Sequence, residues 1–460
     1  MSSTKPPSGT RDFLPADIRR REHAIGVVRQ VYERYGFEPL ETPAFENIET
    51  LLGKYGEEGN KLIFKILRRG EHEASGEADL ALRYDLTVPL ARVVAQYQNE
   101  LPRLFKRYQI QPVWRADRPA KGRFREFYQC DIDAIGSTSP IVEVELLAAA
   151  SDVLEELGFG SDFVIRLNDR RLLAALLETA GVPQSLGGEA LIAIDKQDKI
   201  GRAGVIGELA ARGIDTPVAE RLLGLLAVDD DRGSGDGPVD RADGNGRILD
   251  HLEQEIDDRP GGRQGLDELK TIVGLARATS ANEHIVVSPS LARGLSYYTG
   301  AIMEIAVKDL AGSLGGGGRY DNLIGMFLGR EVPACGFSLG LERIIVVMTE
   351  RNWFKASAVA GGVDVMIAFM DDESRDDALR LAGELRREGV RVEVYPEASR
   401  KFDKTLKHAA TRGARLMAIF GENERMTRQV SIRNLTTRVQ DAVPRDQAVA
   451  EITQRLNPEP

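Results

Sequence analysis

Residues 105–136 contain two stretches of alternating side chains joined by a basic segment with proline and glycine, the pattern of two adjacent β-strands. Because strand side chains alternate between two faces, every second residue from Arg123 onward shares one face. That face carries Arg123, Arg125, Phe127, Gln129, Asp131 and Asp133. It extends for about 33 Å from cations, past a ring and an amide, to carboxylates. It suits a long ligand with a phosphate end, a flat ring and an amine end, although a half-buried strand also exposes such a face to water.

Length and composition indicate a globular protein of about three domains. The chain has 460 residues, 42% of them hydrophobic and 29% charged. Two cysteines cannot form a disulfide scaffold, which favours a reducing cytoplasm. No leader and no apolar run of about 18 residues is evident, so we expect neither secretion nor a membrane span. The net charge of −10 argues against coating of nucleic acid, whereas the cations gathered in 103–125 indicate a polyanion bound at a defined place.

The pattern of elements changes along the chain and predicts separate parts. Helices are expected at about 16–35 and 141–158, and the acidic, glycine-rich segment 228–246 is expected to be an exposed loop. From Val363 onward, strands and helices alternate, which predicts a small α/β domain with a mixed sheet. The predicted parts are a strand-rich domain in two pieces (1–166 and 280–350), a helical insertion (167–279), a linker (351–362) and the α/β domain (363–460).

Four further tracts carry candidate ligand groups, although each alone also fits ordinary packing. LRYDLTVPL (82–90) is expected to place Asp85 and Thr87 on one strand face, where they could bind an ammonium group. In CGFSLGLERII (335–345), Arg343 is expected in the first turns of a helix; a cation there opposes the helix dipole and indicates an anionic partner. The other tracts are LARGLSYYTG (291–300), with Arg293, Tyr297 and Tyr298, and the glycine run LGGGGRYDNL (314–323).

Together and in this order, the tracts resemble the histidyl-tRNA synthetase family of class II aminoacyl-tRNA synthetases. YGFEPLETPAFE (35–46) is similar to motif 1, FKRYQIQPVWRAD with GRFREFYQCDID to motif 2, and GFSLGLERI to motif 3. ARGLSYYTG, GGGGRYDNL and the N-terminal SGTRDFLP resemble tracts typical of the histidine enzyme. The resemblance implies an α+β catalytic domain with an antiparallel six-stranded sheet flanked by helices, a helical insertion and a C-terminal α/β anticodon-binding domain.

The resemblance also implies an activity: ATP-dependent ligation of L-histidine to tRNA(His) through a histidyl-adenylate, in the cytoplasm. ATP would be a substrate, with Mg²⁺ bound through its phosphates, and no separate metal site is expected. A homodimer is implied, with residues 35–50 in its interface. The tail fits tRNA binding, because residues 399–438 hold ten cations against three acids, a net of +7.

Site residues follow from the resemblance position by position. The implied catalytic residues are Arg115 and Arg293. The implied histidine-binding residues are Asp85, Thr87, Arg115, Gln129, Asp133, Arg293, Tyr297 and Tyr298, with Asp133 and Tyr298 reading the imidazole. The implied ATP-binding residues are Arg115, Asp117, Arg123, Phe127 and Arg343. Arg433 and Arg438 are the implied tRNA contacts.

Two departures from the family pattern stand near these residues. Ser296 occupies a position where the family usually has aspartate, and Asp85 one where many bacterial relatives have glutamate. Alternative functions are a regulatory partner of ATP phosphoribosyltransferase, a tRNA-sensing domain of a regulator, and a synthetase for glycine, threonine or proline. The retained arginines and the complete tail disfavour the first, no kinase-like segment supports the second, and ARGLSYYTG disfavours the third.

Overall fold

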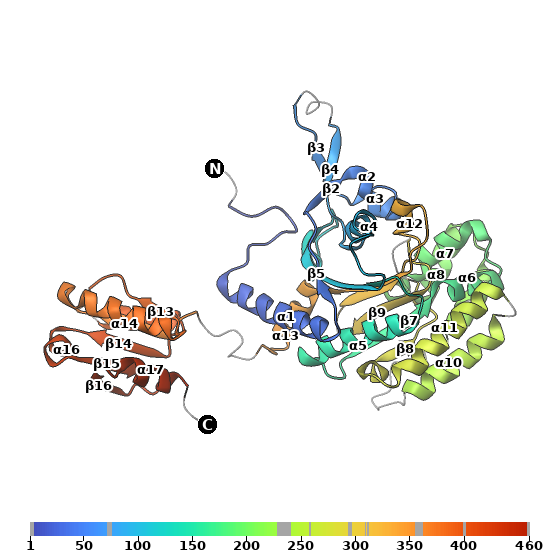
Figure 1. Ribbon diagram of the computed structural model, residues 1–460. Coiled ribbons are helices and arrows are strands. Elements are labelled where there is room, and N and C mark those ends of the chain that lie inside the picture. The colour runs from blue at the N-terminus through green and yellow to red at the C-terminus, as the bar shows by residue number, and fades with distance from the viewer. Residues whose placement is uncertain are drawn as a thin grey trace. The chain divides into compact units, whose positions relative to one another are not determined.

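The computed structural model describes residues 4–70, 76–227, 241–256, 259–292, 297–308, 310, 312–354, 362–398 and 402–457. Its internal contacts divide the chain into two compact units, Met1–Trp353 and Phe354–Pro460 (Figure 1). Among the described residues, no helix is long and apolar enough to cross a membrane. The division into five parts stays a prediction, and each unit is described by itself.

An eight-stranded sheet forms the centre of the first unit. Its strands in spatial order are β1 (Glu38–Pro39), β5 (Phe105–Trp114), β6 (Glu126–Ile135), β11 (Ala334–Gly340), β10 (Gly315–Arg319), β9 (Ala301–Val307), β7 (Phe163–Asp169) and β8 (Ile285–Val287). The six strands from β5 to β7 in this order pair antiparallel, which confirms the predicted six-stranded core. The short strands β1 and β8 add a parallel partner at either edge.

Helices α1 (Pro15–Arg34), α5 (Ile141–Glu156) and α13 (Leu341–Glu350) pack together along one face of this sheet (Figure 1). The Tyr32 hydroxyl of α1 donates to the Cys130 carbonyl at 3.0 Å, and the Tyr128 amide donates to Glu342 of α13 at 2.9 Å. The helices thereby cover the side of β6 where Tyr128 lies against α1 and α13. The intervening residues of β6 face the opposite side, as strand alternation requires.

The opposite side is closed by short helices and a small sheet. These elements are α2 (Ile48–Leu51), α3 (Gly56–Lys61), α4 (Thr87–Gln96), α12 (Gly325–Leu328), β2 (Phe45–Asn47), β4 (Ala78–Leu82) and β3 (Lys65–Leu67). In Figure 1 the β3–β4 hairpin projects above the rest of this unit. Tyr55, Tyr84, Tyr297 and Tyr320 belong to one apolar cluster beneath these elements. Several aromatic rings from distant segments therefore meet on the side of the sheet that the polar face of β6 lines.

The middle of the chain is helical, as expected. Its elements are α6 (Arg170–Ala180), η2 (Gln184–Leu186), α7 (Gly187–Ile194), α8 (Gln197–Ala211), α9 (Thr216–Leu226), α10 (Arg241–Glu255), α11 (Pro260–Ala276) and η4 (Ser280–Glu283). Asp169 caps α6 by accepting the Arg171 amide at 2.8 Å, and Gly181 ends the helix with a φ of 92°.

One loop prediction in this region is partly wrong. Residues 241–246 belong to α10, whereas 228–240 lie outside the described residues. Asn245 is buried there, because its amide donates to the Ile285 carbonyl at 2.9 Å and its oxygen accepts the Val287 amide at 2.8 Å. The side chain thus satisfies the free edge of β8, a role that a polar, glycine-rich sequence does not reveal.

The second unit has the mixed sheet that the alternation predicts. Its strands in spatial order are β13 (Val392–Val394), β12 (Val365–Phe369), β14 (Leu416–Phe420), β15 (Gln429–Asn434) and β16 (Gln440–Pro444). The first three run parallel, and the last two pairings are antiparallel. Its helices are η5 (Asp372–Ser374), α14 (Arg375–Arg387), α15 (Phe402–Thr411), α16 (Glu422–Thr427) and α17 (Ala448–Leu456). The sequence did not predict α16 or β16, both of which are short and polar.

Candidate active site

The polar face of β6 forms one wall of the candidate site. It carries Phe127, Gln129, Asp131 and Asp133 on the side away from α1 and α13. The Gln129 amide donates to Ser338 Oγ on the neighbouring strand β11 at 2.8 Å. β6 begins only at Glu126, so the expectation that the strand extends back to Arg123 is wrong. Residues 115–125 form a loop instead, in which Ala120 and Arg123 make an isolated bridge.

The carboxylate of Asp133 is enclosed by groups from three other segments. Tyr320 donates its hydroxyl to one carboxylate oxygen, and the other oxygen lies 2.8 Å from Nη2 of Arg107. Gly336 lies directly across on β11, and a Cβ atom there would stand 1.9 Å from Asp133 Oδ1. Any larger residue at position 336 would therefore displace the carboxylate.

Tyr298 lies over the next glycine along the sheet. Gly318 of β10 pairs directly with Gly336 of β11, and a Cβ atom on Gly318 would stand 3.0 Å from the Tyr298 ring. Directly paired residues project to the same face with Cα atoms about 5 Å apart. Tyr298 and Asp133 therefore occupy neighbouring places on one face of the sheet, although 165 residues separate them in the chain.

Asp85 is a buried carboxylate at the start of a helix, not part of a strand. Its oxygens accept the Val88 amide at 3.0 Å, the Tyr55 hydroxyl at 3.0 Å and the Tyr297 hydroxyl at 3.2 Å. The predicted strand face shared with Thr87 is wrong, because Thr87 is the first residue of α4. Burial raises the pKa of Asp85 against these stabilising contacts, and a carboxylate at a helix N-terminus is favourably placed.

Arg115 directly follows β5 and lies close to two aromatic rings. Its Nε donates to the Tyr84 carbonyl at 3.0 Å, and its guanidinium lies 4.3 Å from the Tyr84 ring centre and 5.1 Å from that of Phe127. Because Tyr84 directly precedes Asp85, the backbone that positions this cation also positions the buried carboxylate. The remaining guanidinium nitrogens can donate to an anion beside the Phe127 ring.

The basic loop and α13 provide the other predicted cations. Arg123 binds Asp117 with two hydrogen bonds, of 3.1 and 2.8 Å. Arg343 donates to the Gly122 carbonyl at 3.3 Å and also to the Ser313 carbonyl. A Cβ atom on Gly312 would lie 2.7 Å from Arg343 Nη1. Arg343 therefore links the basic loop to the segment before β10. It contacts the loop at Gly122, five positions before Phe127 in the chain.

Two predicted positions lie outside the described residues. Arg293 and Ser296 belong to residues 293–296, so their roles remain those implied by the resemblance. The pair that follows is described: the Tyr297 and Tyr298 rings lie edge to face, with centres 5.2 Å apart. Tyr297 contacts Asp85, and Tyr298 lies over Gly318 toward Asp133.

Sequence reasoning missed two buried charges in this wall, Arg107 and Asp131. Arg107 has no exposed surface, and Asp131 lies 3.9 Å from it on β6. Burial raises the pKa of Asp131 to about 7, opposed by Arg107 and reinforced by Asp133. The parity of β6 placed Asp131 on the right face, but no role was assigned to it. Arg107 was counted only among the cations of 103–125, in a strand that also contains Lys106, Gln109 and Gln111.

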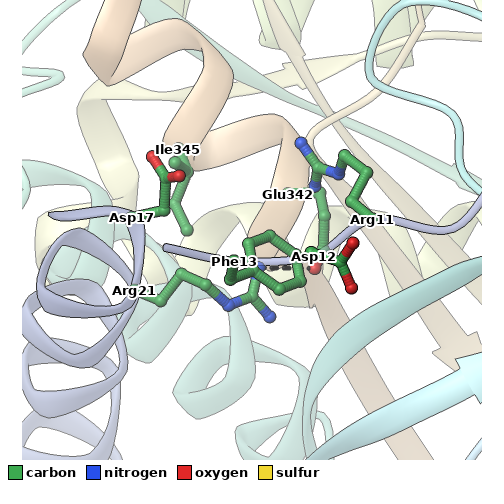
Figure 2. A pocket seen from close by; sticks show the side chains of 7 residues that line it. All are labelled: Arg11, Asp12, Phe13, Asp17, Arg21, Glu342 and Ile345. Carbon is green, nitrogen blue, oxygen red and sulfur yellow. Dashed lines mark hydrogen bonds and ion pairs between the residues drawn. The ribbon is translucent and has the colours of Figure 1, made fainter. Parts of the chain in front are cut away.

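A pocket of about 140 Å³ lies on the other side of β6, between the N-terminal segment, α1 and α13 (Figure 2). It is lined by Arg11, Asp12, Phe13, Asp17, Arg21, Glu342 and Ile345. Arg21 donates to Glu342 at 2.8 Å, and Glu342 also accepts the Tyr128 amide. No predicted ligand residue lines this pocket. Two of its charged residues, Arg21 and Glu342, contact Tyr128 near the start of β6.

Family models match both units of the chain. A family model described as histidyl-tRNA synthetase matches residues 9–344, and one described as anticodon binding domain matches residues 364–455. A histidine–tRNA ligase of Porphyromonas gingivalis is 40% identical, over 97% of this chain and 98% of the relative. The chain belongs to the histidyl-tRNA synthetase family. A second relative with the same name, from Gloeobacter violaceus, is 39% identical over 97% of this chain and 98% of its own length.

Solved structures agree with this family assignment. A crystal structure of histidyl-tRNA synthetase from Nostoc sp. has a TM-score of 0.80 and 30% identity, and the match covers 99% of this chain and all of that one. A structure from Bacillus halodurans, described as an ATP phosphoribosyltransferase regulatory subunit/histidyl-tRNA synthetase, has a TM-score of 0.71 at 21% identity, covering 92% of this chain and 99% of that one. At that identity the second likeness shows the fold alone.

Proposed function

We propose how individual side chains of this chain carry out its family's reaction, the ATP-dependent ligation of L-histidine to tRNA(His). Family membership gives the overall reaction and its substrates, histidine, ATP and tRNA. In the first step the histidine carboxylate attacks the α-phosphate of ATP and expels pyrophosphate. In the second step the histidyl-adenylate esterifies the terminal adenosine of tRNA(His). Neither step needs a covalent bond to the protein, so catalysis rests on positioning and charge stabilisation.

Asp133 and Tyr298 are the proposed readers of the imidazole ring. Their neighbouring positions over the paired glycines Gly336 and Gly318 are the observation that carries this proposal. Imidazole presents one donor and one acceptor, and a carboxylate beside a phenol can address both nitrogens. Burial raises the pKa of Tyr298, which keeps the phenol protonated and able to donate. A substrate without matching groups would leave the Tyr298 hydroxyl and the ligand-facing side of the Asp133 carboxylate without a partner.

The α-amino group of histidine is assigned to the part of the pocket formed by Asp85, Thr87 and Gln129. Asp85 provides a buried carboxylate there, and Thr87 and Gln129 supply neutral oxygens. The Gln129 Oε1 atom is buried without a hydrogen-bond partner among the described residues. An ammonium group has three donors, so these three acceptors match it in number. Tyr297, fixed against Asp85, contributes to the same end of the pocket.

The phosphates of ATP are assigned to the arginines. Arg115 and Arg293 would contact the α-phosphate, and Arg343 the outer phosphates. Phe127 offers a ring for adenine, near the Asp117–Arg123 pair. Mg²⁺ would accompany ATP through the phosphate oxygens, its usual ligands with nucleotides. Among the described residues, no group of three or more His, Cys, Asp or Glu side chains is arranged to bind a metal ion.

Assembly and location form a further part of the proposal: a cytoplasmic homodimer with residues 35–50 in its interface. β1 and β2 lie in this range, and Phe45 is 51% exposed in the single chain. An exposed phenylalanine on a short edge strand favours burial against a second copy. Light scattering at micromolar concentration should give twice the chain mass, whereas a fully active monomer would contradict the dimer.

Histidine-dependent exchange of pyrophosphate into ATP tests the whole proposal. The purified chain should exchange with histidine and negligibly with glycine, threonine, proline or serine. Asp133→Asn should lower kcat/KM for histidine by about 100-fold, because truncating a buried charged contact typically costs 2–5 kcal/mol. Asp117→Asn is the matched control and should change KM for ATP rather than that for histidine. Comparable exchange with another amino acid would refute the proposal.

A further inference from the structure

Arg107 connects the two ends of the candidate histidine pocket. It lies on β5, has no exposed surface, and places Nη2 2.8 Å from Asp133 Oδ2. The same nitrogen donates to the Leu86 carbonyl at 3.3 Å, and Nη1 donates to the Gln109 side chain at 3.2 Å. Leu86 stands between Asp85 and Thr87 in the chain. One guanidinium therefore contacts both the carboxylate assigned to the imidazole and the segment assigned to the amino group.

The charges around Arg107 do not balance. Asp133 lies 2.8 Å and Asp131 3.9 Å from its Nη2 atom, so two carboxylates share one cation. Asp131 Oδ1, Asp133 Oδ2 and Arg107 Nε are buried without hydrogen-bond partners among the described residues. Buried charges without full pairing are costly unless another group compensates them. When both carboxylates are ionised, the cluster carries one excess negative charge, and loss of the arginine would leave two.

We propose that Arg107 is the positioning residue of the histidine pocket, which fixes the Asp133 carboxylate in place and offsets the charge of Asp131. This inference rests on the proposed assignment of Asp133 to the imidazole. The guanidinium reaches Asp133 from the β5 side, while Tyr320 donates to its other oxygen. The Tyr320 hydrogen bond to Oδ1 and the ion pair of Arg107 with Oδ2 together restrict the carboxylate, while Oδ2 makes no hydrogen bond among the described residues, so the ligand meets a preorganised acceptor. Without Arg107, the like charges of Asp131 and Asp133 would repel each other, so the position of Asp133 depends on the arginine.

The first experiment measures histidine binding separately from chemistry. Arg107→Met should raise KM for histidine by about 30-fold or more, because removing one partner of a buried charge pair leaves the other uncompensated. It should change KM for ATP and kcat by less than about threefold, because other arginines are assigned to bind the α-phosphate. Arg171→Met is the matched control: Arg171 pairs with the fully buried Asp169, outside the pocket. It should lower the melting temperature without raising KM for histidine.

A double variant separates positioning from general loss of folding. Asp131→Asn combined with Arg107→Met restores the original net charge of the cluster. The double variant should bind histidine at least about tenfold more tightly than Arg107→Met does. Such a coupling is expected of groups in direct contact. It also provides the readout if Arg107→Met alone does not fold. Equal KM for histidine in the double variant and in Arg107→Met, or unchanged KM in Arg107→Met, would overturn the inference.

Failure of this inference is distinguishable from failure of the proposed function. If Asp133→Asn raises KM for histidine and Arg107→Met does not, the pocket assignment stands and only the role of Arg107 is refuted. If neither variant changes KM for histidine while the chain still exchanges with histidine, the pocket assignment itself fails. Binding of histidine by isothermal calorimetry, without ATP, gives the same comparison free of any effect on chemistry.

Discussion

Charged side chains are arranged in opposite ways in the β6 wall and in the second unit. In the wall, Arg107, Asp131 and Asp133 are almost completely buried and contact one another. In the second unit the cations of the described residues 402–438 lie mostly at the surface, with Arg438 exposed and Arg433 partly exposed. Buried charges interact strongly and depend on geometry, whereas exposed charges are screened by salt. The wall is therefore suited to selecting one small molecule, and the tail to attracting a polyanion.

Some of the cations counted in 399–438 are already paired with acids of the same unit. Three cations counted there bind acids that lie outside 399–438. These ion pairs are Lys404–Glu397, Arg412–Glu393 and Arg425–Asp371. Among the described residues, Arg433 and Arg438 form no ion pair, and the same holds for Lys407, Arg415 and Arg428, so ion pairing leaves all five open to phosphate contacts. A sequence sum of +7 thus overstates the charge available to tRNA.

The largest expected effect is at the reacting phosphate. Arg115→Ala should slow single-turnover adenylate formation by about 10²–10³-fold, the usual cost of removing one donor to developing charge. Binding of histidine should change much less, because the contact strengthens in the transition state. Arg115→Lys should restore only part of the rate, since an ammonium lacks the guanidinium fork. An unchanged adenylation rate in Arg115→Ala would remove this residue from the mechanism.

A smaller effect is expected from the glycine beneath Asp133. Gly336→Ala places a methyl group 1.9 Å from the Asp133 oxygen, so the carboxylate must move. We expect KM for histidine to rise by about 10- to 100-fold, as for a misplaced binding group. Gly224→Ala is the control, because nothing lies within 4 Å of a Cβ atom at that helical position. That change should stabilise the fold slightly and leave KM unaltered; equal KM values for both variants would argue against the geometry.

The titration of Asp131 gives a prediction for stability. Its pKa is raised to about 7 in the folded chain from 3.8, so the folded state binds the proton more tightly than the unfolded state. The wild-type chain should therefore lose stability relative to Asp131→Asn as pH rises from about 5 to 7.5, by about 1–4 kcal/mol. Arg107, Asp133, Asp85 and Tyr298 are the ionisable groups facing it. Denaturant melts of both chains across this range check the sign, and parallel curves would contradict it.

Much of this architecture was predictable from local patterns, and the misses have identifiable causes. The alternation in 126–135 gave the correct face for Gln129 and Asp133, because a strand fixes side-chain parity. The Asp85–Thr87 segment was misread as a strand, since a carboxylate three residues before a helical amide also fits an N-terminal cap. The pairing of Arg107 with Asp133 joins two strands by register, which no local pattern encodes.

The smallest effects are expected in the tail. Arg433→Ala and Arg438→Ala should each weaken tRNA binding several-fold and lower the slope of log affinity against log salt by about 0.7–0.9 per lost phosphate contact. Lys404→Ala is the control, because Lys404 already pairs with Glu397 at 3.0 Å. Filter binding at several salt concentrations measures both quantities. Identical slopes for all three variants and the wild-type chain would argue against phosphate contacts at these positions.

Removal of residues 363–460 tests most directly whether the first unit forms the adenylate and the second unit binds tRNA. The candidate adenylation residues all precede this segment, and the first unit, Met1–Trp353, is compact by itself. The measurement is the ratio of histidine-dependent pyrophosphate exchange to tRNA(His) charging, for the truncated and the full chain, with circular dichroism confirming the fold of each. Exchange should survive in substantial part, while charging should fall at least about tenfold further, as expected when phosphate contacts are lost. Charging of tRNA(His) by the truncated chain at the rate of the full chain would contradict this account.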